Sequence, residues 1–117
     1  MRKSKEYVEY VIVRADSGVF AGELASWKPR AGCAYADCVI KRARRIWRWF
    51  GFDGPPVVQV SCVEQIATNG VCVTNTNPDR RSRVSPTVAR IEIADARQYV
   101  VATDIARELI ERAEWNG

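Results

Sequence analysis

Residues 7–27 read YVEYVIVRADSGVFAGELASW and carry the clearest fold signal in the chain. Residues 7–15 are rich in β-branched and aromatic side chains, which favour a strand, and residues 16–18 (DSG) are typical of a tight reversal. Residues 19–27 form the return strand, in which Gly22 indicates a bulge or a close approach of two backbones. The fold is therefore predicted to begin with a β-hairpin.

The following segment extends the predicted sheet. After a turn at residues 28–32, residues 33–40 (CAYADCVI) predict a third strand. Residues 41–50 (KRARRIWRWF) fit both a helix and a strand, because their apolar residues recur at helical spacing while the stretch is dense in aromatic residues. We favour the strand, which places Arg45, Trp47 and Trp49 on one face and Arg44, Ile46, Arg48 and Phe50 on the other.

The second half of the chain predicts a short helix and then further strand. Ser61 and Glu64 have the spacing of a capping box, so a helix is expected over residues 61–69. Gly70 is its natural left-handed terminator. Residues 84–102 resume the alternation that is typical of strands.

A second helix is expected over residues 103–113, where Thr103 supplies the cap. This order of elements predicts an α+β fold, a small and mostly antiparallel twisted sheet of about five strands with a short middle helix and a C-terminal helix. The chain, residues 1–117, is expected to form a single domain, and an SH3-like barrel is the specific architecture we consider for the sheet. The core-facing stripe of the last helix is expected to contain Ile105, Leu109, Arg112 and Ala113.

The composition excludes several kinds of chemistry. The 117 residues include no histidine, which removes Ser-His-Asp triads, Cys-His pairs and histidine metal ligands. No apolar run is long enough for a signal peptide or a membrane span, which predicts a cytoplasmic protein without membrane contact. Four cysteines lack zinc-site spacing, so we expect neither metal nor cofactor and predict reduced core residues at Cys33, Cys38, Cys62 and Cys72.

The candidate binding residues lie in the segment 41–50. Arginine forks bind phosphate and indole rings stack on bases, so a mixture of the two fits a nucleotide or a single-stranded nucleic acid. The competing interpretation is structural, with Ile46 and Trp47 in the core and the arginines on a solvated edge. Five cations fall within eight residues, namely Lys41, Arg42, Arg44, Arg45 and Arg48. As ligand-binding residues we single out Arg44, Arg45, Trp47, Arg48 and Trp49.

Three motifs carry a resemblance to a known family: residues 10–14 (YVIVR), 18–24 (GVFAGEL) and 43–49 (ARRIWRW). With these motifs the chain resembles a family of small, uncharacterised proteins encoded by tailed phages and prophages. The family often has Tyr where Arg48 stands in this chain. The resemblance implies an accessory protein that acts inside a bacterial host cell, and it brings no established activity with it.

The expected function is binding rather than catalysis. No paired carboxylates and no phosphate loop of the GxxxxGK type stand out, so we do not expect an enzyme. We expect a non-catalytic phage accessory protein that sequesters a small nucleotide, such as a host-defence signal, and the net charge of +4 favours this pocket over a long phosphate track. Two alternatives stay open, a nucleic-acid-binding protein that uses the same segment and a protein-interaction module that inhibits a host factor.

Self-association is also expected, as a dimer with two-fold symmetry. The chain has more large aromatic side chains than one shallow core readily covers, and closed pairing is the commonest way to cover them. These residues are Trp27, Trp47, Trp49, Phe50, Phe52 and Trp115.

Overall fold

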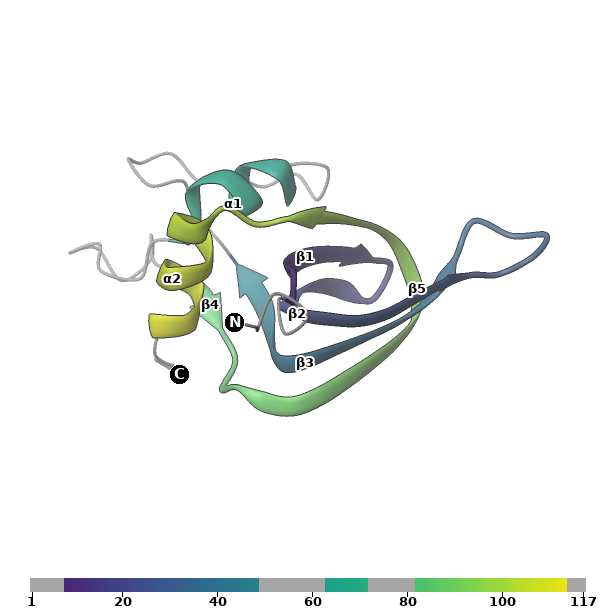
Figure 1. Cartoon of the computed structure of the whole chain (residues 1–117), viewed down its shortest axis with the longest axis horizontal. Coiled ribbons are helices and arrows are strands. Elements are labelled where there is room, and N and C mark those ends of the chain that lie inside the picture. Colours follow the sequence, from purple (N-terminus) through teal and green to yellow (C-terminus); the bar gives the residue numbers. More distant parts are fainter. Residues whose placement is uncertain (1–7, 49–62, 72–81, 114–117) are drawn as a thin grey trace, which may run out of the picture.

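The computed structural model describes residues 8–48, 63–71 and 82–113 (Figure 1). Within these ranges, five antiparallel strands form one sheet in the order β2-β1-β5-β3-β4, accompanied by two helices. The predicted α+β class, with a short middle helix and a C-terminal helix, is therefore confirmed. The elements are β1 (Tyr10–Ala15), β2 (Gly18–Pro29), β3 (Ala36–Arg48), α1 (Val63–Asn69), β4 (Arg83–Val84), β5 (Val88–Val101) and α2 (Asp104–Arg112).

The strand pairings close on themselves. Besides its pairing with β1, β2 also pairs with β3, so the neighbours β2, β1, β5 and β3 form a ring of four strands. Figure 1 shows β5 as a long curved strand on one side of this ring, while the turn between β2 and β3 projects away from the ring. The more specific SH3-like architecture stays a prediction.

The first hairpin matches its sequence signal. Ala15 pairs with Gly18 across a turn made of Asp16 and Ser17. The expected irregularity at Gly22 is also present, because the pairing of β2 with β3 shifts register at that position. A Cβ on Gly22 would lie 3.0 Å from the carbonyl oxygen of Lys41, so the two backbones approach too closely for a side chain.

One continuous strand, β3, replaces the two predicted segments at residues 33–40 and 41–50. The strand interpretation is confirmed for residues 41–48, and the helical alternative is wrong there. Residues 33–35 precede the strand instead of belonging to it. The physical reason is that β3 pairs with β2 on one side and with β5 on the other, which satisfies its backbone more completely than the local helical spacing does.

One boundary of each helix lies where the sequence indicates. The helix α1 stops before Gly70, whose φ is +79° and whose N–H donates to the carbonyl oxygen of Ile66 at 2.8 Å. The helix α2 begins at the predicted cap, where Thr103 Oγ1 accepts a hydrogen bond from Ala106 N at 3.1 Å. The expected cap of the first helix at Ser61 lies outside the described residues.

The predicted core-facing stripe of α2 is wrong in part. Ile105, expected in the core, is 68% exposed, whereas Ala106 and Ile110 are fully buried. Thr103 ties the start of α2 to α1, because its N–H donates to Ala67 O and its hydroxyl to Thr68 O. These contacts set the rotation of the helix about its axis, which the apolar pattern of α2 alone leaves open.

Two hydrophobic clusters occupy the two sides of the strands. All four ring strands contribute to one of them: Val11, Val13, Ala15, Phe20, Cys38, Ile40, Ala43, Ile93 and Ala96. The other packs the strands against both helices and contains Tyr10, Ile12, Val19, Ala21, Ile46, Val63, Ile66, Ala67, Val71, Val84, Ile110 and Ala113. The helices thus cover one face of β1 and its neighbours, and this second cluster positions the candidate site.

The cysteine prediction holds for one of the two described cysteines. Cys38 is buried, and burial raises the pKa of its thiol to about 11. Cys33 is exposed in the turn between β2 and β3, so its predicted place in the core is wrong. Cys62 and Cys72 lie outside the described residues. In the described part of the chain, no helix is long and apolar enough to cross a membrane.

Candidate functional site

The structure describes the side chains of two of the five predicted site residues, Arg44 and Arg45. Their backbone lies in β3, where successive side chains point to opposite faces, so the two guanidinium groups are separated by the sheet. Trp47 and Arg48 also lie in β3, but their side chains are outside the description, as is the whole of Trp49. The structure therefore does not test the five predicted residues as one site. The two residues with described side chains are considered one at a time.

Arg44 is buried and bound to backbone. Its side chain is 3% exposed, its Nε donates to Ser85 O at 2.7 Å, and its NH1 donates to Ile110 O at 2.7 Å. The last carbonyls of a helix lack partners within the helix, so Arg44 caps the C-terminal end of α2. Burial lowers the pKa of this guanidinium from its ordinary value.

Arg45 braces the first hairpin on the opposite face. Its NH2 donates to the carbonyl oxygen of Ser17 in the β1–β2 turn, and its guanidinium lies over the ring of Phe20, 5.5 Å from the centroid. Its backbone N–H donates to Ser85 Oγ at 2.8 Å. These contacts give Arg45 a structural role, and they hold it away from Arg44.

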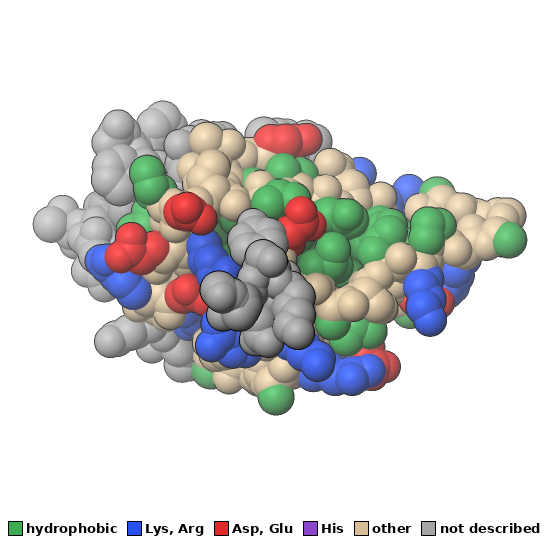
Figure 2. All heavy atoms as spheres, viewed as in Figure 1, with side chains coloured by type: hydrophobic (Ala, Val, Ile, Leu, Met, Phe, Trp, Pro, Cys, Tyr) green, Lys and Arg blue, Asp and Glu red, His purple; other side chains and the backbone are tan. Residues whose placement is uncertain are grey.

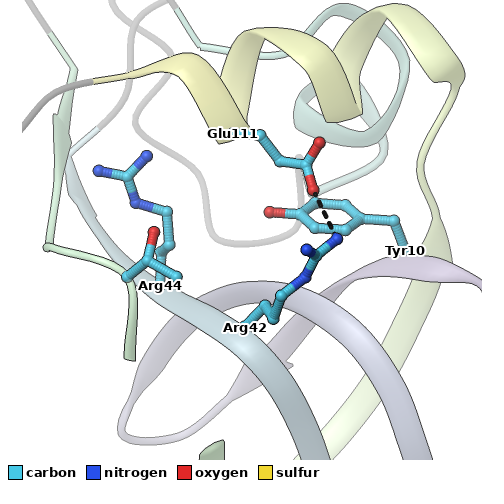
Figure 3. Close-up of a pocket in the computed structure, with 5 residues that line it drawn as sticks. Tyr10, Arg42, Arg44 and Glu111 are labelled. Carbon is cyan, nitrogen blue, oxygen red and sulfur yellow. Dashed lines mark ion pairs between the residues drawn. The ribbon is translucent and has the colours of Figure 1, made fainter. Parts of the chain in front are cut away.

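Arg44 instead lines a cavity of about 320 Å³ that is formed by four parts of the chain. In Figure 3 the phenol ring of Tyr10 points from β1 into the space between Arg44 of β3 and Glu111 of α2. Arg42 extends from β3 toward Glu111, with 3.7 Å between its NH2 and Glu111 Oε2. We call this space the Tyr10 cavity; it is lined by Tyr10, Arg42, Arg44, Thr87 and Glu111.

Arg42 reaches the Tyr10 cavity through an unusual backbone conformation. Its φ is +47°, in the left-handed region that residues with a side chain rarely adopt. The strain falls where the β2–β3 register shifts, opposite Gly22. Such a bulge redirects a side chain, and here the Arg42 guanidinium is 63% exposed and donates to Glu23 Oε2 at 2.7 Å. Strained backbone of this kind often occurs at binding sites.

Tyr10 supplies the most unusual polar group of the cavity. The residue is 3% exposed, and its hydroxyl has no hydrogen-bond partner among the described residues. A buried hydroxyl without a partner costs about 1 to 3 kcal/mol. Burial raises the pKa of Tyr10 to about 12, with the Glu111 carboxylate acting in the same direction. At neutral pH the hydroxyl is therefore a protonated donor that can still accept a partner.

Positive charge slightly exceeds negative charge around the Tyr10 cavity. Arg107 lies over the Tyr10 ring at 5.0 Å and binds Glu23 at 2.9 Å and Glu111 at 3.3 Å. With Arg42 and Arg44, three arginines thus face two glutamates. Figure 2 shows acidic and basic side chains side by side on the surface over α2. An anion with further polar groups fits this balance better than a cation does.

No metal centre is visible in the described ranges, where no three His, Cys, Asp or Glu side chains come close enough to hold an ion. The sequence did place Arg42 in a cluster of cations but did not select it as a site residue. It gave no reason to select Tyr10, Thr87 or Glu111. These residues come from β1, the segment before β5, and α2, and no local sequence pattern indicates that they meet.

Comparison with known proteins identifies a family whose function is unknown. The model of a domain of unknown function (DUF6948) matches residues 8–110. No curated protein and no solved structure matches the chain.

Proposed function

Because the chain belongs to the DUF6948 family, whose function is unknown, we propose a function from the geometry: non-catalytic binding of a small phosphate-bearing ligand, a nucleotide, in the Tyr10 cavity. The observation that carries this proposal is the buried Tyr10 hydroxyl that lacks a partner beside Arg42 and Arg44. Phosphate oxygens accept hydrogen bonds, and a phenol and two guanidinium groups donate them.

The cavity favours a nucleotide over a bare anion. Glu111 presents a carboxylate to the same space, and this group accepts a hydrogen bond from a sugar hydroxyl or a base amino group. A nucleotide offers such donors beside its phosphate. The volume of about 320 Å³ is at the lower end of the range of small-ligand sites, and it has no room for an extended nucleic-acid strand.

Two local costs in the Tyr10 cavity also support binding. The strained backbone of Arg42 and the unsatisfied hydroxyl of Tyr10 both reduce stability. A ligand phosphate that accepts from both groups would offset these costs. The phage context and the role against a host-defence signal remain predictions from the resemblance, and the cytoplasmic location remains a prediction from the sequence.

Calorimetry with the four nucleoside monophosphates and with a single-stranded DNA oligomer tests this proposal. We expect one or more of the monophosphates to bind with a modest salt dependence. Arg42→Gly removes the guanidinium but relieves the left-handed backbone, so we expect at least a tenfold loss of affinity with stability kept or raised. The matched control is Arg112→Ala, since Arg112 is 69% exposed and does not line the cavity.

Tyr10→Phe separates a binding role from a structural one. The variant loses only a hydroxyl that has no described partner, so the free energy of unfolding should be unchanged or higher at neutral pH while nucleotide affinity falls. Binding of the oligomer alone, with affinity that falls steeply as salt rises, would favour the nucleic-acid alternative. If neither ligand binds, the proposal is wrong and the interaction-module alternative takes its place.

A further inference from the structure

The first half of β5 has one edge without a partner among the described strands. The strand β3 pairs with β5 from Val88 to Ala96, whereas β1 pairs with β5 only from Ala96 to Val101. At Asp95 the carbonyl oxygen accepts from Asp16 N at 3.2 Å, so the second edge of β5 meets no described strand over residues 88–94. Figure 1 shows this part of β5 along the lower outer rim of the molecule. A free strand edge offers N–H and C=O groups to another strand.

The side chains of this edge alternate in a way that suits strand pairing. Arg90 and Glu92 are exposed on one face, and Ile93, on the other face, is buried. Arg90 NH2 lies 2.6 Å from Glu92 Oε2, and the two side chains are 54% and 67% exposed. Figure 2 shows basic and acidic side chains together along the same rim. The edge thus carries one charge of each sign, two residues apart.

This spacing makes the edge complementary to itself. We propose that β5 binds the β5 of a second copy of this chain, antiparallel and about a two-fold axis at Ile91. In that register Arg90 lies directly opposite the partner subunit's Glu92, and Glu92 lies opposite the partner subunit's Arg90. Directly opposed charges of opposite sign stabilise antiparallel strands, whereas like charges destabilise them. An isologous contact of this kind closes on itself and stops at a dimer.

The neighbouring strand supplies a second reason for the same partner. Within the chain, Arg90 is paired across the sheet with Lys41 of β3, so two positive charges lie side by side. Glu92 is opposite Val39 and faces no charge in β3. Arg90 already pairs with Glu92 of its own chain, so the dimer would exchange the two internal pairs for two pairs across the axis and keep a carboxylate beside the Arg90–Lys41 pair. A polyanion would balance the Arg90–Lys41 pair but would conflict with Glu92.

The proposed interface is small. Seven or so residues of a single edge bury less surface than the roughly 1,200 Å² typical of stable complexes, so the dimer should be weak and depend on concentration. The aromatic argument for a dimer is independent of this one. Among the aromatic residues of that argument, Trp27 has a described side chain. It packs within the molecule against Tyr99, with 4.9 Å between the ring centroids.

Charge reversal tests the proposal in the full chain. Sedimentation velocity over a range of concentrations should show a monomer–dimer equilibrium for the wild type. Arg90→Glu and Glu92→Arg each place like charges across the two-fold axis twice, so we expect each variant alone to raise the dimer dissociation constant at least tenfold. An equimolar mixture of the two variants should dimerise again, since the mixed pairs are complementary, and the double variant R90E/E92R should dimerise like the wild type.

A matched control uses the exposed ion pair of α2, Arg112 with Glu108, whose side chains are 69% and 65% exposed. Reversing either of these charges should leave the dissociation constant unchanged. A wild type that stays monomeric at high micromolar concentration would overturn the proposal, and the charges of β5 would then protect its edge. Dimers of both single variants that match the wild type would also overturn it. Nucleotide affinity is measured separately, so failure here leaves the proposed function untouched.

Discussion

Two clusters in this molecule each place a tyrosine beside an arginine and a carboxylate, but only one of them gives the tyrosine hydroxyl a hydrogen-bond partner. In the Tyr10 cavity, Arg107 lies 5.0 Å from the centre of the Tyr10 ring, and in a second cluster, made of Asp16, Tyr35 and Arg97, Arg97 lies 4.8 Å from the centre of the Tyr35 ring. Tyr35 is partly exposed, and its hydroxyl donates a hydrogen bond to Asp16 Oδ2 at 2.5 Å. The Tyr10 hydroxyl is buried and has no described partner.

The difference separates a cluster that stabilises the fold from a candidate binding site. Asp16 accepts hydrogen bonds from Tyr35 and from Arg97, and its Oδ1 lies 2.7 Å from Arg97 Nε. The Tyr35 cluster is therefore complete within the chain, and it connects the first hairpin turn to the turn before β3 and to β5. The Tyr10 cavity keeps one donor unused and holds one backbone in strain at Arg42. Residue type alone therefore does not identify a binding site; unsatisfied capacity beside an open volume does.

The largest expected effect concerns Arg44, the residue of the Tyr10 cavity whose guanidinium is bound to the backbone of other segments. Arg44→Ala removes hydrogen bonds to Ser85 O and Ile110 O and leaves space in the core, so we expect the free energy of unfolding to fall by about 3 kcal/mol or more. Urea unfolding followed by circular dichroism measures this change. The exposed control Arg112→Ala should stay within about 0.5 kcal/mol of the wild type. Equal stability of the two variants would show that Arg44 does not anchor α2.

The next effect concerns the alkaline stability set by Tyr10. The fold raises the pKa of Tyr10 from its ordinary value of 10.0 to about 12, so between these values the folded state keeps a proton that the unfolded chain loses. The contribution of Tyr10 to the free energy of unfolding is therefore fully present below pH 10. It declines between pH 10 and pH 12, by about 2 to 3 kcal/mol. Tyr10→Phe should lose correspondingly less stability over that interval in urea unfolding. An identical decline in both proteins would contradict the burial of a protonated hydroxyl.

The smallest expected effect concerns the exposed Tyr35 cluster. Hydrogen bonds from Arg97, and then from Tyr35, lower the pKa of Asp16, so its contribution to stability is present above the ordinary carboxyl pKa and disappears as the pH falls through the lowered one. Asp16→Asn should cause a slight loss of stability at neutral pH that vanishes in acid and shrinks in high salt, because the group is exposed. A large loss that is insensitive to salt would place Asp16 among buried structural groups instead.

Prediction from the sequence succeeded where a feature depends on near neighbours. The turn at Asp16 and Ser17, the irregularity at Gly22 and the end of α1 at Gly70 each follow from the conformations that those residues allow. The N-terminal cap at Thr103 is equally local. In each case the decisive contact spans only a few residues or excludes a side chain outright.

Prediction was less successful for residues that depend on contacts far apart in the chain. The sequence grouped Arg44 and Arg45 as site residues because they are adjacent, yet the alternation of β3 sends them to opposite faces. It placed Ile105 in the core because the apolar pattern of α2 does not define how the helix is rotated about its axis. Contacts of Thr103 with α1 and of Arg44 with Ile110 set that rotation, and they join residues dozens of positions apart.

The sequence by itself determined the α+β class, the order of the strands and helices along the chain, and the absence of histidine chemistry, because propensity, turn residues and composition are local properties. Only the tertiary structure decided that β2 also pairs with β3, that Arg42 adopts a left-handed backbone, and that Tyr10 and Glu111 line one cavity. Tyr10 and Glu111 lie at opposite ends of the described chain. Their proximity follows from closure of the strand ring and the docking of α2, which no local rule specifies.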